Sequence, residues 1–194
     1  AGWTPSSGAG LDDFWVLKLR ADGTVEWQKT YGGRGSEQAS CIRQTDEGGY
    51  IVTGRTGSYG AGPYDIWVLK LQAYGSLHWA KTYGGIHLDE AHFIGQTTEG
   101  GYVVAGWISY EFPPFGKHLQ ELKMRFWVLK LREEGSVEWQ KTYERGQFDM
   151  LSSAQQTRDG GYILAGSTIP FGEYRGRDIL IFKLSADVSI NPSC

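Results

Sequence analysis

The hexapeptide Phe14-Trp15-Val16-Leu17-Lys18-Leu19 decides the fold, because close copies of it recur along the chain. The copies start at residues 66, 126 and 179, and they read IWVLKL, FWVLKL and ILIFKL. The spacings between successive copies are 52, 60 and 53 residues. Self-similarity at such a period is the mark of a repeat protein in which each repeat forms one supersecondary unit.

Three further motifs recur with the same spacing, each in three copies. They are WxKTY at residues 27–31, 79–83 and 139–143, Gln-Thr at 44–45, 96–97 and 156–157, and Gly-Gly-Tyr at 48–50, 100–102 and 160–162. Each Gly-Gly-Tyr is followed by an apolar pair and then by another glycine. So many agreements at fixed offsets indicate one structural unit that is repeated along the whole chain.

One repeat predicts four short antiparallel strands, at residues 39–45, 50–56, 66–71 and 77–83. Glycine-containing turns at 46–49 and 73–76 separate them, as in β-hairpins. In the segment 25–31, Val25, Trp27, Lys29 and Tyr31 alternate with polar residues, which is the period of a strand. The expected fold class is therefore all-β.

The combined pattern resembles the β-propeller repeat proteins that bacteria and archaea secrete or display on their surface. The resemblance covers nearly the whole chain and implies β-propeller-type blades of four antiparallel strands, distantly similar to WD40, kelch and quinoprotein propellers. The Trp-Asp and Gly-His markers of WD40 repeats are missing. The chain supplies about three blades plus an extra strand, whereas closed propellers usually have four to eight blades.

We expect a single β-propeller-repeat domain over residues 1–194, with repeat units at about 13–64, 65–124 and 125–177, a terminal strand at 178–184 and a tail at 185–194. Gly2-Trp3-Thr4 aligns with the end of a second strand, and the last unit lacks a WxKTY strand. Both ends therefore predict exposed strand edges, which are templates for pairing with another chain. The alternatives are self-assembly, a fragment of a longer propeller and a compact incomplete monomer.

Composition excludes several classes of protein. The formal net charge is −3 and the isoelectric point is about 5.8, so the basic footprint of a nucleic-acid-binding protein is missing. The sequence has no apolar run of the ~18 residues that span a bilayer. The chain starts at Ala1, as cleavage of a signal peptide or of a recombinant precursor would leave it. We expect a secreted protein, extracellular or on the cell surface.

The end strands carry the residues that we expect at an assembly interface, namely Trp3, Phe14, Trp15, Ile179, Leu180, Ile181 and Phe182. We expect Trp67 and Trp127 to pack between units, as Trp15 does in its own repeat. Trp3 and Trp107 occupy a position where other copies have Arg55 and Ser167. That variation favours a solvent or interface position over the core.

The 60-residue spacing contains an insertion at residues 109–125, between the second and third strands of its unit. Long loops on a rigid scaffold tend to carry function, so this loop is a candidate contact surface. Its contact candidates are Tyr110, Phe112, Phe115, Lys117 and Arg125. Arg125 replaces the aspartate that the other copies have at 13, 65 and 178. The alternative is a length variation without function.

The two cysteines, Cys41 and Cys194, are candidates for a disulfide within the chain or between neighbouring chains. The alternative is two free thiols. Cys41 has no cysteine at the equivalent positions of the other repeats, so the blades themselves do not require it.

Motifs for catalysis are missing, and the four histidines are scattered. An acidic residue recurs at 37, 89 and 149, where turn capping is the simpler reading and a calcium site the other. No other cofactor is expected. We therefore predict a non-enzymatic structural protein that self-assembles head-to-tail by strand complementation into a filament, sheath or ring. The alternatives are an adhesion or glycan-binding propeller module that recognises surface glycans, and a fragment of a longer propeller.

Overall fold

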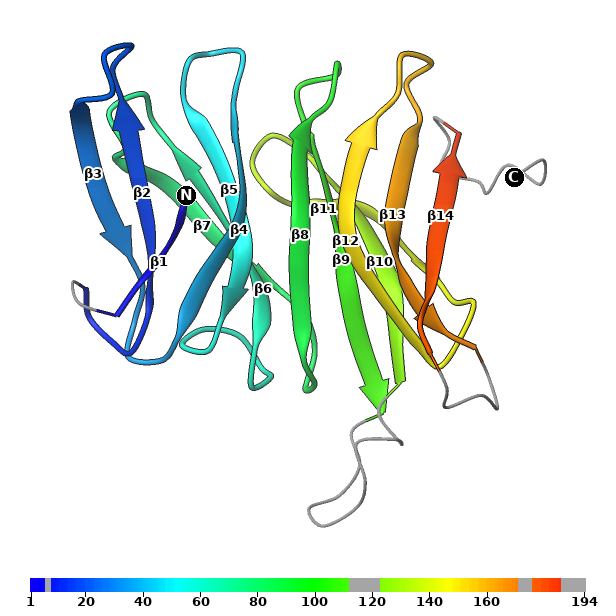
Figure 1. Cartoon of the computed structure of the whole chain (residues 1–194). Helices are drawn as coiled ribbons and strands as arrows, with labels where there is room; N and C mark the ends of the chain where they lie inside the picture. Colours follow the sequence, from blue (N-terminus) through cyan, green and yellow to red (C-terminus); the bar gives the residue numbers. More distant parts are fainter. Residues whose placement is uncertain (6–7, 112–122, 171–175, 186–194) are drawn as a thin grey trace.

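The computed structural model describes residues 1–5, 8–111, 123–170 and 176–185, and the regular structure in these ranges consists of β-strands (Figure 1). The strands are β1 (Gly2–Thr4), β2 (Asp13–Leu19), β3 (Val25–Tyr31), β4 (Glu37–Gln44), β5 (Tyr50–Thr56), β6 (Asp65–Leu71), β7 (Leu77–Tyr83), β8 (Asp89–Gln96), β9 (Tyr102–Glu111), β10 (Lys123–Leu131), β11 (Val137–Tyr143), β12 (Phe148–Gln156), β13 (Tyr162–Ile169) and β14 (Asp178–Leu184). The all-β class that the repeat predicts is confirmed.

The strands form four successive antiparallel groups, which we call units I to IV. Unit I is β1–β3, unit II is β4–β7, unit III is β8–β11 and unit IV is β12–β14. Units III and IV belong to one seven-stranded sheet, because Met124 of β10 forms a single parallel bridge with Phe148 of β12. The earlier junctions have the same bridge at equivalent positions, Asp12 with Ser36 and Tyr64 with Leu88.

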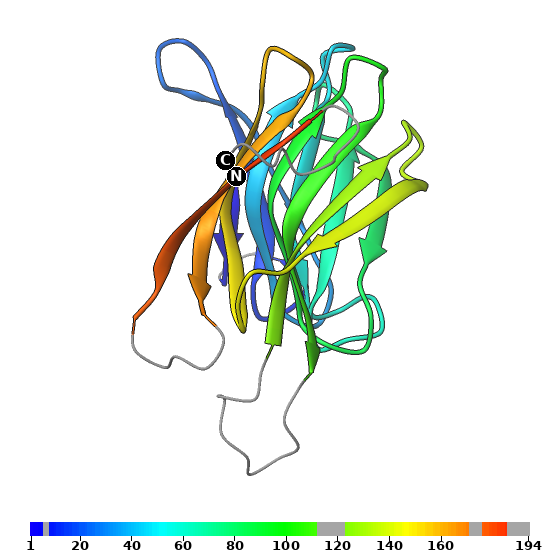
Figure 2. The ribbon, with the colours of Figure 1, turned by 90° about the vertical axis from the view of Figure 1, so that its right-hand side faces the viewer.

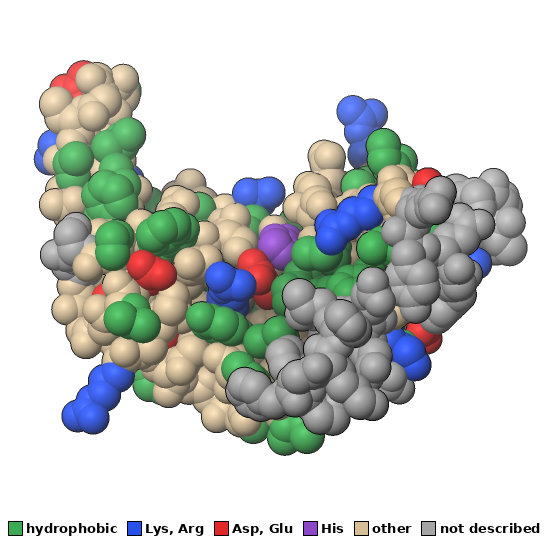
Figure 3. Space-filling model, turned by 60° about the horizontal axis from the view of Figure 1, so that its bottom comes forward, with side chains coloured by type: hydrophobic (Ala, Val, Ile, Leu, Met, Phe, Trp, Pro, Cys, Tyr) green, Lys and Arg blue, Asp and Glu red, His purple; other side chains and the backbone are tan. Residues whose placement is uncertain are grey.

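The four units stand side by side in chain order, with units I and IV at opposite ends (Figures 1 and 2). The first strands of units II, III and IV lie on one side of the row, and β8 contacts both β4 and β12. Seen toward its lower end, the molecule has a curved outline with a hollow on one side (Figure 3). No sheet formed by the described residues closes on itself.

The observed strands agree closely with those expected from the repeat. The strands β5 and β7 have the expected bounds, and β4 and β6 start two and one residues earlier than expected. The short strand β1 pairs with β2 in the register in which β5 pairs with β6, since Gly2 lies opposite Trp15 as Gly54 lies opposite Trp67. The chain thus enters unit I in its second strand, as the alignment predicted.

The glycine that follows each Gly-Gly-Tyr motif is required by a close approach of two strands. A Cβ built on Gly54 would lie within 3.0 Å of the carbonyl oxygen of Gln38, and one on Gly106 would meet that of Glu90 in the same way. At both places the pairing register shifts by one residue, as in a β-bulge. Backbone therefore occupies the space that a side chain would need.

Neighbouring units are held together by apolar cores that lie between their sheets. We call the strand that carries the repeated hexapeptide the third strand of its unit, because it is third in a complete unit; these strands are β2, β6, β10 and β14. Along each third strand, alternate side chains point to opposite sides. In β6, Ile66 and Val68 pack in the core shared with unit III, whereas Trp67, Leu69 and Leu71 pack in the core shared with unit I. Each interior sheet therefore contributes to two cores, one on each of its faces.

The WxKTY motif fastens the outer strand of one unit to the next unit. The hydroxyl of Tyr83 donates a hydrogen bond to the carbonyl of Gly135 over 2.6 Å, and Tyr31 donates to Gly75 in the same manner. The ring of Trp79 packs edge-on against Tyr102 of unit III, with centroids 6.2 Å apart. The equivalent tryptophans are thus used in packing between units.

Because each interior sheet packs on both of its faces, we expect the same substitution at equivalent repeat positions to change the free energy of unfolding by very different amounts in different units. Leu71 is fully buried in the core between units I and II, whereas the equivalent Leu19 is 51% exposed. Leu71→Ala should lower the free energy of unfolding by about 2–5 kcal/mol, and Leu19→Ala by less than about 1 kcal/mol. Urea unfolding in dilute solution measures both; equal losses would contradict the assignment of the junction cores.

Candidate functional site

The outer face of unit IV exposes residues that are buried in every other unit. Ile179 is 84% exposed and Ile181 is 58% exposed. The residues at the equivalent positions of the other third strands have exposed fractions of 0–1%: they are Phe14, Val16, Ile66, Val68, Phe126 and Val128. These positions face the following unit. The outer face of unit IV therefore exposes apolar residues of the kind that pack between units elsewhere, and no described residue covers them.

The outer face of unit I is formed by the positions that, in the other units, face the preceding unit. Trp15 is 36% exposed and Leu19 is 51% exposed. Their equivalents in unit II, Trp67 and Leu71, have exposed fractions of 5% and 0%. Val25 of β3 pairs with Leu19 and adds to this apolar face. We call these two surfaces the unit I face and the unit IV face.

The structure corrects part of the expected assembly interface. Phe14 and Phe182 are buried in the cores between units, and Leu180 packs against the core between units III and IV. Those three side chains point inward because alternate residues of each third strand face opposite sides. Trp3 lies opposite Phe14, so it sits on the side of β1 that faces unit II, half exposed. Ile179, Ile181 and Trp15 remain on the open faces.

The expectation for Trp107 is wrong. Trp107 is buried beside Met124 in a small cluster, and its indole donates a hydrogen bond to Nε2 of His92 over 3.2 Å. The position differs between repeats because here an aromatic ring fills space near the base of the insertion. Burial lowers the pKa of His92, which favours the neutral imidazole that accepts this hydrogen bond.

At the insertion, the structure brings together Tyr110, Arg125 and Glu144. The guanidinium of Arg125 lies 3.7 Å from the centroid of the Tyr110 ring and 2.9 Å from the carboxylate of Glu144. The hydroxyl of Tyr110 donates to the same carboxylate over 2.7 Å. Phe112, Phe115 and Lys117, the other loop candidates, lie outside the described residues.

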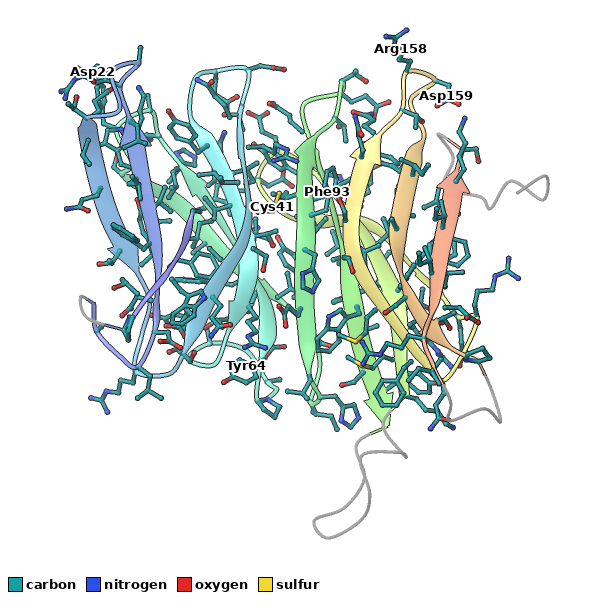
Figure 4. The ribbon with its side chains drawn as sticks, in the orientation of Figure 1. Asp22, Cys41, Tyr64, Phe93, Arg158 and Asp159 are labelled. Atoms are coloured by element: carbon teal, nitrogen blue, oxygen red, sulfur yellow. The ribbon has the colours of Figure 1, made fainter. Side chains whose placement is uncertain are left out.

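The disulfide stays a prediction. Cys41 is a free, buried thiol in the core between units II and III, and its Sγ lies 3.9 Å from the carbonyl oxygen of Ile94. It stands on β4, and Phe93 holds the equivalent repeat position on the neighbouring β8 (Figure 4). Cys194, the expected partner, lies outside the described residues.

Two pairs of buried carboxylates meet at the lower end of the first two junctions. Asp13 and Glu37 come together beside Gly32, and Asp65 and Asp89 come together beside Gly84. A Cβ built on either glycine would lie within 3.0 Å of oxygens from both carboxylates of its pair. The recurrence of acids at these positions of the sequence does not by itself show that they meet in pairs.

Each of these carboxylates also anchors a loop. Glu37 accepts the amide of Gly33 over 2.8 Å, and Asp89 accepts that of Gly85 over 2.9 Å. Asp65 accepts the amide of Gly62 over 2.9 Å. The expected turn-capping role is therefore confirmed for these acids.

The third junction has different charged residues at the equivalent positions. Asp149 keeps the position of Glu37 and Asp89 and caps the amides of Arg145 and Gly146. Arg125 replaces the first acid of the pair, and Glu144 stands where the other junctions have a glycine. The pairing of two carboxylates is thus replaced by the ion pair of Arg125 with Glu144.

A groove of about 530 Å³ crosses the first strands of units II, III and IV. Amide side chains line it, among them Gln44, Gln96 and Gln156 from the repeated Gln-Thr motif. Phe93 also borders the groove, and the guanidinium of Arg43 lies 5.9 Å from its ring centroid. Three units therefore contribute equivalent polar groups to one surface.

Comparison of the chain with protein-family models and with curated proteins found no match. In the part of the chain that the structure describes, no helix has the length and apolar character needed to cross a membrane. Nor do three or more His, Cys, Asp or Glu side chains gather there in a way that would hold a metal ion. The open faces and the paired carboxylates are thus the features that call for a functional explanation.

The carboxylate pair at the second junction predicts a pH-dependent stability. Burial raises the pKa of Asp89 to about 6, the negative charge of Asp65 acts in the same direction, and the amide of Gly85 opposes both. Burial likewise raises the pKa of Asp65. Because the pKa of Asp89 is higher in the folded chain than in the unfolded chain, its contribution to stability is complete below about pH 4. That contribution is lost as the pH rises through about 6.

In chelator-treated buffer, the free energy of unfolding should therefore fall by on the order of 2 kcal/mol more in the wild type than in Asp89→Asn between pH 4 and pH 7.5. Urea unfolding at several pH values measures the two profiles. Parallel profiles would show that Asp89 keeps an ordinary pKa in the folded chain.

Proposed function

We propose that this chain is a non-enzymatic structural protein whose copies associate head-to-tail, with the unit IV face of one copy docked on the unit I face of the next. The observation that carries the proposal is the equivalence of these faces to the two sides of the internal junctions. Ile179 and Ile181 hold the positions of Ile66 and Val68, which pack against Trp127 and Leu129. Trp15 and Leu17 hold the positions of those two partners.

The apolar character of both faces supports a partner of the same repeat type. Repeat proteins whose units contact only their neighbours need terminal units with polar outer faces to stay soluble. Here the outer faces carry Ile179 and Ile181 at one end and Trp15, Leu19 and Val25 at the other. A second copy of the chain offers at each end the surface that the internal junctions use.

A head-to-tail contact uses two different surfaces, so it leads to a closed ring or to an open filament. The side-by-side row of sheets and its hollowed outline support a propeller-type arrangement in which the units of several copies continue one array (Figure 3). Association then rests mainly on the docking of faces, with the free edges of β1 and β14 beside the contact. An extracellular or surface location, where such assemblies form sheaths and appendages, belongs to the same proposal.

The alternative function, a glycan-binding module, is supported by the 530 Å³ groove. Amide groups from three units and the ring of Phe93 are suited to a neutral saccharide, which binds through hydrogen bonds and stacking on aromatic rings. The groove lies on β4, β8 and β12, away from β14. Saccharide binding there would survive a change that destroys the unit IV face, which separates the two functions experimentally.

A charge on the unit IV face should abolish association. Ile179→Asp places a carboxylate at the centre of the proposed contact, where docking would strip it of water, so the variant should be a monomer of about 21.6 kDa in light scattering. The wild type should give larger particles whose mass rises with concentration.

The matched control is Ile86→Asp. Ile86 is 73% exposed in the loop between β7 and β8 and belongs to neither open face, so this variant should associate as the wild type does. A wild type that is monomeric at high concentration, or an Ile179→Asp variant that associates like Ile86→Asp, would contradict the proposal.

A further inference from the structure

Two carboxylates come together at each of the first two junctions, and the backbone amides that their loops donate are uncharged. Asp13 is 2% exposed, and its Oδ1 accepts no hydrogen bond from the described residues. This orphan oxygen and Oε2 of Glu37 both lie within 3.0 Å of the position that a Cβ on Gly32 would take. A buried oxygen without a donor is therefore aimed at a second buried carboxylate.

The second junction has a similar pair of acids. Oδ1 of Asp65 and Oδ2 of Asp89 both lie within 3.0 Å of the position that a Cβ on Gly84 would take, and this Oδ2 accepts the amide of Gly85. Asp89 has an exposed fraction of 0%, and its Oδ1 has no hydrogen-bond donor among the described residues. An unpaired charge in such a place is costly, and proteins relieve the cost by neutralising the group or by pairing it with a cation.

The third junction differs from the first two in its charged residues. There Arg125 stands in place of Asp13 and Asp65, and its guanidinium pairs with Glu144. Oδ1 of Asp149 is likewise buried without a hydrogen-bond donor among the described residues, so the third junction differs from the first two in the charge at Arg125 and not in the orphan oxygen. Positive charge is thus built into the chain at the one junction of the three that lacks the facing acids. By comparison, the first two junctions are missing a positive charge at the same place.

We propose that the Asp13–Glu37 and Asp65–Asp89 pairs each bind one calcium-like divalent cation, and that the third junction binds none. The donor atoms are carboxylate oxygens, which suit hard cations such as calcium, whereas zinc and copper favour imidazole or thiolate ligands. Two carboxylates are few for such a site, so the remaining ligands would be backbone carbonyls of the surrounding glycine-rich loops and water, which calcium accepts readily. Each cation would fix neighbouring units to one another through their loops.

Titration calorimetry with CaCl₂ at pH 7.5, on chain first treated with chelator, tests the number of sites. The wild type should bind two calcium ions, and thermal unfolding should show a midpoint raised by roughly 10–20 °C at calcium about 100-fold above its Kd. Asp65→Asn should bind one ion, and Asp13→Asn with Asp65→Asn none. Circular dichroism without calcium verifies that each variant is folded.

Two variants taken from the chain's own third junction sharpen the test. Asp149→Asn changes a buried acid that has no facing carboxylate, so it should leave both calcium ions bound. Asp65→Arg places the arginine of the third junction at the second junction, with Gly84 unchanged, and should remove one calcium ion.

Lowering the pH should weaken calcium binding, since protons compete for the same oxygens. The proposal is overturned if the wild type binds no calcium and its midpoint does not move. It is also overturned if Asp65→Asn still binds two ions, or if Asp149→Asn loses one. A stability that depends on pH but not on calcium would show that each pair shares a proton instead. None of these outcomes depends on whether the chain self-associates.

Discussion

Each third strand divides its side chains between two junctions, and the rest of the structure depends on this division. In β6, Ile66 and Val68 pack toward unit III, and the alternate residues Trp67, Leu69 and Leu71 pack toward unit I. Each interior sheet in this chain therefore has both of its faces covered. Because the same rule applies to units I and IV, their outer faces are apolar surfaces of a kind that is covered everywhere else in the molecule. This constraint connects the repeat to the proposed association.

Much of the fold could be predicted from the sequence, because the repeat supplies strands, turns and their order in one pattern. The four-stranded unit and the entry of the chain at Gly2-Trp3-Thr4 follow from alignment of the copies alone. It was harder to predict from the sequence which side chains of the end strands are exposed. Phe14 and Trp15 are adjacent aromatics, yet one is buried and the other partly exposed, because only the position of the neighbouring sheet decides which side is covered. Trp107 was misjudged because variation between repeats also arises where an insertion changes the local packing.

The carboxylate pairs show what a sequence conceals when a site is formed between repeats. Asp65 and Asp89 are 24 residues apart and belong to different units, so their approach depends on how two sheets dock. One signal was available in the sequence: Arg125 and Glu144 both depart from the repeat, and their charges are opposite. Joint departures of this kind point to residues in contact. Gly32 and Gly84 fit the same reasoning, since a side chain there would collide with both carboxylates.

The most direct test of head-to-tail docking mixes two variants that each keep one open face. Ile179→Asp destroys the unit IV face, and Leu19→Asp destroys the unit I face. Each variant alone should be monomeric, and an equimolar mixture should form a dimer and nothing larger, because one intact face remains on each partner. Sedimentation velocity of the mixture distinguishes the cases. A mixture that stays monomeric, or either variant forming oligomers alone, would contradict head-to-tail docking of these two faces.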